Sequence, residues 1–199
     1  MTLNPKLLKN LRFAYAQEFP FELKFEHFKP LVVLAGYSNV GKSTFINAIT
    51  GEKVAKISKT PGKTRTINTY YNQNSPVTLI DLPGYGFANL AQNEQKKWEK
   101  MMKSFFETIE DPVLVLNLVD ARRGIRELDQ YMEVAVGDFG FVFARVFNKA
   151  DELNQSEKSK LKEQILVSVK NKIKLNLIFD LLGKFVSENK KVSPVNPVS

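Results

Sequence analysis

The chain has 199 residues, 43% of them hydrophobic and 25% charged, so it is long enough for one soluble domain with a sizeable core. It has no cysteine and a single histidine, which excludes disulfides and thiolate metal sites and disfavours serine–histidine catalysis. The net charge of +8 favours a polyanionic partner such as RNA, although such an excess can also be spread over solvated faces.

The sequence predicts neither a membrane span nor a secretory signal. No apolar run approaches the roughly 20 residues that cross a bilayer. The N-terminus lacks an uninterrupted apolar core followed by a small-residue cleavage site. We therefore expect a cytoplasmic protein.

Short apolar runs alternate along the chain with longer amphipathic stretches. The runs are rich in branched or aromatic residues and predict buried strands at 31–36, 77–81, 113–120 and 141–148. The stretches carry apolar residues every three or four positions and predict helices at 42–50, 93–110, 125–138 and 156–172. TRTINTYYN is expected to pair with the strand at 77–81 as a hairpin, adding one antiparallel edge strand. The alternation predicts an α/β fold with a mostly parallel sheet and helices on both faces.

The first motif, GYSNVGKS, lies between the predicted strand 31–36 and the predicted helix 42–50. Gly36 and Gly41 let the backbone turn so that successive N–H groups and the helix N-terminus face one concavity that fits phosphate oxygens. Lys42 would then face the β and γ phosphates, and the Ser43 hydroxyl would bind Mg²⁺. The alternative is a glycine turn before a helix with an exposed lysine. The predicted phosphate-binding residues are Gly36, Tyr37, Ser38, Asn39, Val40, Gly41, Lys42 and Ser43.

The second motif, NKAD at 148–151, indicates which base is bound. It follows a predicted strand and so lies at the same edge of a parallel sheet as the phosphate loop. Asp151 can accept hydrogen bonds from N1–H and the exocyclic amine of guanine, a donor pair that adenine lacks, so GTP is favoured over ATP. Alone, the four residues could be a turn without a ligand. The predicted base-binding residues are Asn148, Lys149, Ala150 and Asp151.

The third motif, DLPG, contains Asp81, Leu82, Pro83 and Gly84. Asp81 can hold Mg²⁺ through water, and the Gly84 amide can donate to the γ phosphate, so loss of that phosphate would release the following loop. Without a ligand, DLPG would be a proline–glycine turn. In the segment before it, KISKTPGKTRTINTY, one of Thr60, Thr64 and Thr66 is expected to complete the Mg²⁺ shell, as in a switch ordered by the γ phosphate.

These motifs resemble those of the EngB (YihA/YsxC) family of bacterial GTPases, in the TrmE-Era-EngA-EngB-Septin group. The resemblance covers about residues 11–155, and its specific stretches are TPGKTRTIN and DLPGYGFA. It implies a Ras-like P-loop domain with a mostly parallel, six-stranded sheet that has one antiparallel edge strand. It also implies that the protein binds GTP with Mg²⁺, hydrolyses it slowly, assists assembly of the large ribosomal subunit and is needed for cell division and septation. The domains that it implies are an N-terminal extension (1–22) and a GTPase domain (23–191); residues 192–199 are expected to be a disordered tail. We expect a monomer.

The resemblance also implies roles for single residues. Thr64 would be the switch threonine, which makes Ser43, Thr64 and Asp81 the metal set and Lys42, Thr64 and Gly84 the catalytic set. The nucleotide site would also include Gly62, Lys63, Thr64, Arg65 and Thr66. Related GTPases with asparagine at the position of Asn39 use it to coordinate a potassium ion; alternatively, the asparagine tolerates the backbone geometry of the loop.

The C-terminal end departs from the family pattern. FVSENKK at 185–191 loosely matches the family's base-contacting loop, which would make Val186, Ser187 and Glu188 base contacts. Its distance from NKAD is several residues too long, and no closing helix follows. Alternatively, 178–191 is itself the closing helix and the base loop lies earlier.

Two features bear on the rate of GTP hydrolysis and on the binding partner of the protein. Tyr85 stands where many Ras-like proteins have a water-orienting glutamine, so slow hydrolysis is expected unless a partner or a monovalent cation stabilises charge. The predicted helix after DLPG carries lysines that offer either a surface for ribosomal RNA or a solvated face: Lys96, Lys97, Lys100 and Lys103.

Two other classes of function compete with a GTPase switch. A P-loop kinase for a small molecule needs an arginine-rich lid, and the arginine cluster available is Arg122, Arg123 and Arg126. A nucleotide-independent RNA-binding protein would not need the intact Lys42, Ser43 and Asp81.

Overall fold

The structure is a computed structural model that describes residues 2–8, 12–17, 30–56, 66–72, 74–86 and 92–189, with the backbone alone at 12–17, 92–95 and 97. Its strands are β1 (Arg12–Gln17), β2 (Leu31–Gly36), β3 (Ile67–Tyr71), β4 (Thr78–Asp81), β5 (Val113–Asp120), β6 (Val142–Asn148) and β7 (Ile165–Leu166). Its helices are α1 (Lys42–Thr50), α2 (Gln92–Glu107), α3 (Glu127–Asp138), α4 (Gln155–Lys160) and α5 (Asn176–Glu188). Short 3₁₀ helices are η1 (Pro5–Leu8) and η2 (Ala150–Glu152).

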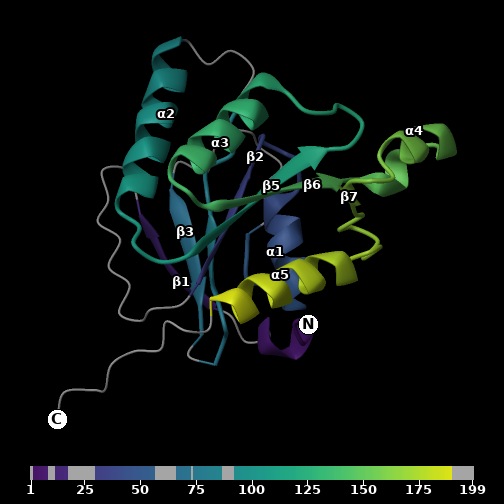
Figure 1. The fold of residues 1–199 in the computed structure, drawn as a ribbon, viewed down its shortest axis with the longest axis horizontal. Coiled ribbons are helices and arrows are strands. Elements are labelled where there is room, and N and C mark those ends of the chain that lie inside the picture. Colours follow the sequence, from purple (N-terminus) through teal and green to yellow (C-terminus); the bar gives the residue numbers. More distant parts are fainter. Residues whose placement is uncertain are drawn as a thin grey trace.

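The described strands form one sheet in the order β1-β3-β4-β2-β5-β6-β7 (Figure 1). β3 pairs antiparallel with both β1 and β4, whereas every other pair is parallel, so β3 is the one described strand that runs opposite to the rest. The predicted α/β class, with helices on both faces, is confirmed. The sheet has seven strands rather than six, and the antiparallel strand is not at the edge, because β1 covers β3.

Successive side chains of a strand point to opposite faces of the sheet, so the core has one part on each face. In β2, Val32 and Leu34 pack with α1 and α5, while Leu31 and Val33 pack with α2 and α3. Figure 1 shows these helix pairs on opposite sides of the sheet. Because both faces of the central strands are covered, β2 and β5 are buried along their whole length.

The predicted helices at 42–50, 93–110 and 125–138 are confirmed with shifts of at most three residues at their ends, as are the four predicted strands and the hairpin of β3 with β4. η1 lies against the domain, where Leu8 is fully buried and the Leu3 amide donates to the carbonyl oxygen of Phe179 at 3.0 Å. The domain boundary predicted at residue 22 and the tail at 192–199 lie outside the described residues and stay predictions. No helix among the described residues is both long and apolar enough to cross a membrane.

The predicted helix at 156–172 is wrong beyond Lys160. The chain turns there, and Ile165 and Leu166 pair with β6 as the edge strand β7. The four residues from Leu166 to Val169 are all buried, an arrangement that a helix with one exposed face does not allow. α4 itself has no buried residue, and in Figure 1 it lies apart from the other helices.

The interpretation of 185–191 as a loop is wrong for residues 185–188. Val186, Ser187 and Glu188 form the last turn of α5, and the Val186 side chain packs in the core with Ile178 and Leu182. The apolar residues of α5 recur every three or four positions, a spacing that places them on one face of a helix, and this face packs in the core. The alternative expectation, that this segment is itself the closing helix, agrees with the structure, and an earlier position of the base loop stays a prediction.

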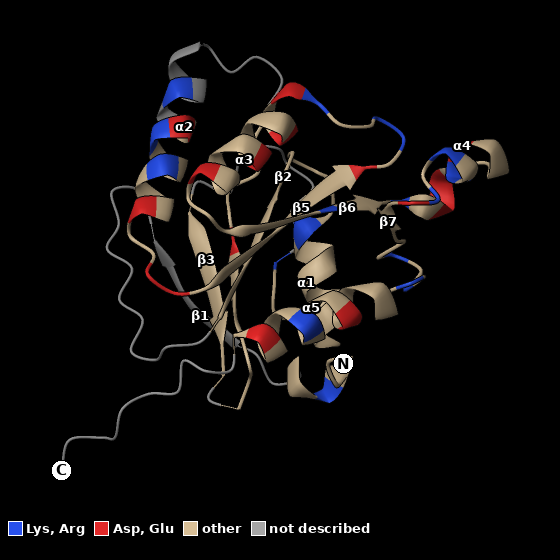
Figure 2. Ribbon diagram, viewed as in Figure 1, with Lys and Arg blue, Asp and Glu red and all other residues tan. Residues whose placement is uncertain are grey.

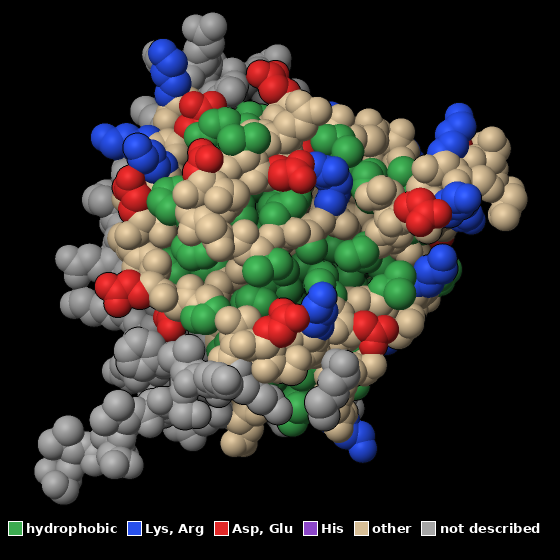
Figure 3. Space-filling view, in the orientation of Figure 1, with side chains coloured by type: hydrophobic (Ala, Val, Ile, Leu, Met, Phe, Trp, Pro, Cys, Tyr) green, Lys and Arg blue, Asp and Glu red, His purple; other side chains and the backbone are tan. Residues whose placement is uncertain are grey.

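Apolar side chains reach the surface between α3 and α5 in the face that Figure 3 presents. β6 contributes to this surface, because its first residue, Val142, is 49% exposed while its last three residues are buried. The buried end of β6 is therefore the end that carries NKAD.

The position of Val186 predicts a stability effect. Replacing Val186 with alanine should lower the free energy of unfolding by about 2 kcal/mol, because two methyl groups leave a packed core. Ser187→Ala, on the exposed side of the same turn, should change it by less than about 0.5 kcal/mol. Urea denaturation of both variants measures the difference; equal effects would contradict the placement of Val186 in the core.

Candidate nucleotide-binding site

Parallel pairing brings the predicted motifs to one edge of the sheet. Leu34 pairs with Asp81 and Asp120 pairs with Asn148, so β2, β4, β5 and β6 all end at the same edge. Ligands of open α/β sheets bind outside the carboxyl ends of the strands. The phosphate loop, DLPG and NKAD therefore surround a common position.

The backbone of the phosphate loop requires its glycines. Gly36 and Gly41 have φ of 143° and 106°, and a Cβ atom on Gly36 would lie 2.5 Å from the carbonyl oxygen of Leu118. Asn39 has φ of 64°, in the left-handed region that asparagine tolerates better than most residues. This geometry accounts for an asparagine in the loop, and its role toward potassium stays a prediction.

Lys42 lies at the centre of the loop. Its Nζ donates to the carbonyl oxygen of Gly36 at 3.0 Å. A Cβ atom on Gly84 would lie 2.8 Å from that Nζ, so the DLPG backbone passes directly beside the ammonium group. Burial lowers the pKa of Lys42, and the carboxylate of Asp81 opposes this shift. The loop lysine and the DLPG glycine are thus adjacent, as the binding of one γ phosphate by both requires.

Asp81 is a buried carboxylate with an unpaired oxygen. Its Oδ1 has no hydrogen-bond partner among the described residues, and burial raises its pKa to about 6, although Lys42 acts in the opposite direction. An unpaired buried oxygen is costly unless a ligand satisfies it. A hydrated Mg²⁺ would do so, with the Ser43 hydroxyl as a second ligand, and these hard oxygen donors fit the ion. Thr64 and the rest of 62–65 lie outside the described residues.

Asn148 joins the NKAD loop to two other loops. Its Nδ2 donates to the carbonyl oxygen of Val40 at 2.9 Å, and its Oδ1 accepts from the amide of Val169 at 3.1 Å. Lys149 reaches the phosphate loop, where its Nζ donates to the carbonyl oxygen of Asn39 at 3.2 Å. The phosphate and base ends of the site are therefore connected by direct hydrogen bonds.

The carboxylate of Asp151, which is predicted to recognise the base, is held by a residue that sequence reasoning missed. The Ser168 hydroxyl donates to Oδ1 of Asp151, and this bond is the main cause that lowers the pKa of Asp151. An ionised Asp151 is the form that accepts two N–H groups from guanine. Ser168 and Val169, rather than residues 186–188, therefore adjoin the NKAD motif. The alternation of apolar and polar residues from Val167 to Val169 is compatible with a strand end, but three residues are too few to distinguish a strand from a helix.

Two of the three arginines in the predicted cluster contact other side chains of the protein. Arg122 donates to both carboxylate oxygens of Asp120 and pairs with Glu152. Burial would raise the pKa of Asp120, yet hydrogen bonds from Arg122 and Lys149 hold it well below its usual range. The guanidinium carbon of Arg126 lies 3.2 Å from the ring centroid of Tyr37. Since Arg122 and Arg126 are engaged in these contacts, the cluster is poorly suited to the mobile lid of a kinase.

The Tyr85 side chain is buried in the core, where its ring packs edge-on against the ring of Tyr37 at 4.7 Å between centroids. Its hydroxyl lies 2.6 Å from Oδ1 of Asn117 and 2.7 Å from Oδ1 of Asp129. Its carbonyl oxygen accepts from the amide of Ser38 at 2.8 Å, so its backbone lines the site while its side chain does not. In this conformation no side chain at position 85 can orient a water molecule.

The remaining predicted residues occupy the margins of the site. The Leu82 amide donates to the carbonyl oxygen of Leu34 at 3.0 Å, which holds the start of DLPG beside β2. Thr66, half-buried, donates weakly to Oδ1 of Asn68 at 3.4 Å. Lys96, Lys100 and Lys103 of α2 are exposed, and the side chain of Lys97 lies outside the described residues.

The fold and the three motifs at its carboxyl edge define a Ras-like P-loop GTPase domain. Residues 31–172 match the family described as 50S ribosome-binding GTPase. The chain belongs to the EngB family of GTP-binding proteins, in agreement with the predicted resemblance.

Two relatives and one solved structure illustrate this membership. Each relative is named probable GTP-binding protein EngB. The relative from Petrotoga mobilis is 45% identical over 137 residues, which are 69% of this chain and 69% of the relative. The relative from Aquifex aeolicus is 42% identical over 68% of this chain and 74% of its own length. A crystal structure of a probable GTP-binding protein EngB superposes with a TM-score of 0.62 over 79% of this chain and 99% of that one; at 24% identity, this likeness concerns the fold alone.

The raised pKa of Asp81 predicts a pH-dependent stability. Because the folded pKa lies above the usual 3.8, the protein without Mg²⁺ and nucleotide should lose stability as pH rises from about 4 to 6. Asp81→Asn removes the buried charge and should be more stable than the wild type by about 2 kcal/mol at pH 7, with the difference vanishing near pH 4. Urea titrations at both pH values measure this, and a difference that does not depend on pH would argue against a buried, unpaired Asp81.

Proposed function

We propose that this chain is a GTP-dependent molecular switch that holds Mg²⁺ with its nucleotide, hydrolyses GTP slowly and acts in the cytoplasm in assembly of the large ribosomal subunit. A requirement in cell division and septation would follow from that role. The observation that carries guanine recognition is the ionised Asp151, held by Ser168 beside a loop that Asn148 ties to the phosphate site.

The unpaired Oδ1 of Asp81 and the neighbouring phosphate loop support the Mg²⁺ site. Ser43 and Asp81 would hold the ion, and Thr64 is the proposed third ligand. Bound there, the ion would neutralise charge on the β and γ phosphates. Lys42 and the Gly84 amide would bind the γ phosphate, so its loss would remove the contact that holds DLPG against the loop.

Slow hydrolysis is supported by the orientation of Tyr85. Phosphoryl transfer depends on positioning and on charge stabilisation. With the side chain at position 85 bound to Asn117 and Asp129, the intrinsic rate lacks one contribution that many Ras-like proteins have. A ribosomal partner or a potassium ion at Asn39 would supply the missing stabilisation. Long-lived nucleotide states suit a switch that times the binding of another molecule.

A ribosomal partner is supported by the description of the matched family, 50S ribosome-binding GTPase, and by the net charge of +8. Purified large subunits mixed with the protein should carry it into the pellet on centrifugation in the presence of a non-hydrolysable GTP analogue. Less protein should pellet with GDP, since the DLPG contact to the γ phosphate is then missing. Equal amounts with both nucleotides would contradict a switch at this step.

Guanine recognition predicts an exchange of base specificity. Asp151→Asn should weaken GTP binding by roughly a hundredfold, because two charge-assisted hydrogen bonds are lost. The same variant should gain affinity for xanthosine triphosphate, whose C2 carbonyl accepts from the asparagine amide. Titration with fluorescent nucleotides in Mg²⁺ measures both affinities. Asp138→Asn, an exposed carboxylate at the end of α3, is the matched control. Unchanged GTP affinity in Asp151→Asn would remove guanine recognition from this loop.

Coordination of potassium by Asn39 can be tested with a variant that preserves the backbone conformation of the loop. Asn39→Gly keeps the left-handed conformation at φ of 64° and removes only the side chain. The wild type should hydrolyse GTP faster in potassium than in sodium, and Asn39→Gly should abolish the difference while retaining GDP binding. If wild type and variant respond equally to potassium, the asparagine serves the loop geometry alone.

A further inference from the structure

Half of the net positive charge lies in a tenth of the chain. Residues 155–174 contain six lysines and two glutamates, a net charge of +4 out of +8. By comparison, α2 has four lysines and three glutamates, a net charge of +1. The segment from α4 through β7 to the following turn is therefore much more basic than α2, for which the sequence left open an RNA surface or a solvated face. Figure 2 shows basic residues on α4 and on the turn beyond β7.

We call the lysines of this segment the basic edge: Lys158, Lys160, Lys162, Lys170, Lys172 and Lys174. All are exposed except the half-buried Lys158. The neighbouring acids neutralise them only in part. Lys162 and Glu163 approach to 3.8 Å with both side chains mostly in solvent, a pair of little strength. Glu157 accepts from the backbone amide of Asn154 as a helix cap, while Asp151 interacts electrostatically with Lys158 and Lys170.

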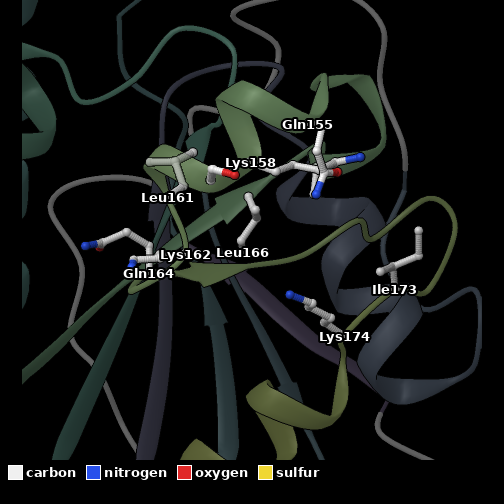
Figure 4. Close-up of a pocket in the computed structure, with 10 residues that line it drawn as sticks. Gln155, Lys158, Leu161, Lys162, Gln164, Leu166, Ile173 and Lys174 are labelled. Atoms are coloured by element: carbon white, nitrogen blue, oxygen red, sulfur yellow. The ribbon is translucent and has the colours of Figure 1, made fainter.

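Three lysines of the basic edge, Lys158, Lys162 and Lys174, line a pocket of about 450 Å³ between α4 and the turn (Figure 4). Its apolar lining includes Leu161, Leu166 and Ile173, and Lys162 and Lys174 lie at its border. A concave surface with apolar walls and charges of one sign concentrates the electric field, because the walls screen less than water does. The pocket therefore strengthens the attraction of an anion to these lysines.

The turn presents its lysines from a backbone fixed in an uncommon conformation. Lys172 and Lys174 have φ of 55° and 57°, in the region that costs a lysine energy. Ser168 and Ile173 hold this turn by exchanging backbone hydrogen bonds of 3.2 and 2.9 Å. Such conformations persist where the surrounding structure enforces them, and they cluster at functional sites.

We propose that the basic edge binds the phosphate backbone of RNA, and this inference rests on the proposed ribosomal function. Phosphate contacts by lysine need exposed positive charge and little apolar surface. A protein partner would need an apolar centre in its interface, and of the apolar residues Leu161, Leu166 and Ile173 that line the pocket, Ile173 alone is exposed. The other exposed side chains that the turn presents at 170–174 are three lysines and an asparagine, a composition that favours RNA.

Ser168 connects this surface to the nucleotide site. It belongs to the turn through Ile173 and binds Asp151 through its hydroxyl. An RNA that shifts the turn acts on the carboxylate that recognises guanine. Coupling between two binding sites is reciprocal, so guanine nucleotide should change RNA affinity by the factor by which RNA changes nucleotide affinity.

The test compares two sets of lysines in the full chain. The edge variant is Lys170→Gln, Lys172→Gln and Lys174→Gln; the control is Lys96→Gln, Lys100→Gln and Lys103→Gln on α2. Glutamine keeps most of the length of the side chain, and urea denaturation checks that each variant is folded. The probe is a short fluorescein-labelled RNA, measured by anisotropy over a series of potassium chloride concentrations.

The edge variant should bind RNA at least roughly tenfold more weakly, and its slope of log affinity against log salt should fall by about two to three, because each removed lysine leaves one phosphate without a neutralising charge. The control should change affinity less than about twofold. Equal losses of affinity in both variants would overturn the proposal, since the binding would then follow total charge. Displacement of the RNA by polyglutamate of equal charge would also overturn it, in favour of an acidic protein partner.

Failure of this inference is distinguishable from failure of the proposed function. If the wild type pellets with large subunits in the presence of a GTP analogue and the edge variant does so equally, the ribosomal function stands and the basic edge is not its contact. If the wild type does not pellet with large subunits, the ribosomal function fails, and the RNA titration still decides whether the edge binds RNA.

Discussion

The side chain of Asn148 holds three loops from distant parts of the chain in one arrangement. Its carboxamide donates to the phosphate loop and accepts from the amide that follows Ser168, and both bonds are buried. Breaking either would leave a polar group without a partner away from water. The NKAD loop, the loop that supports it and the phosphate loop are therefore joined by direct hydrogen bonds, and the basic turn continues directly from them.

Much of the site could be predicted because its motifs describe backbone requirements. The glycines of GYSNVGKS fit positions where a side chain would collide with β5 or Asn148, so the sequence reports the loop geometry directly. Continuous apolar runs identified β2 and β5, which are buried on both faces. Parallel pairing then places the carboxyl ends of these strands together, which is why motifs far apart in sequence could be assigned to one site before any contact was known.

The missed features depend on contacts that no local pattern reveals. β1 pairs with β3, which follows about fifty residues later in the chain. Because this pairing is not local, the sequence assigned residues 12–17 to an N-terminal extension. β7 has two residues, too few for a periodic signal, and the lysines around it fit an amphipathic helix as well as a turn. Ser168 could not be recognised because its role depends on its hydrogen bond to Asp151. That contact forms only because α4 ends at Lys160, whereas the predicted helix continued through Ser168.

The hydrogen bond between Leu3 and Phe179 has a consequence for how the protein is made. Leu3 and Leu8 are buried in a core that α5 completes, although about 170 residues separate them from that helix. Contacts between segments so far apart in the chain form late in folding, because the long loop between them must close first. We expect the segment that contains η1 to stay undocked until α5 has been synthesised, so that an unfinished chain exposes Leu3 and Leu8 to solvent.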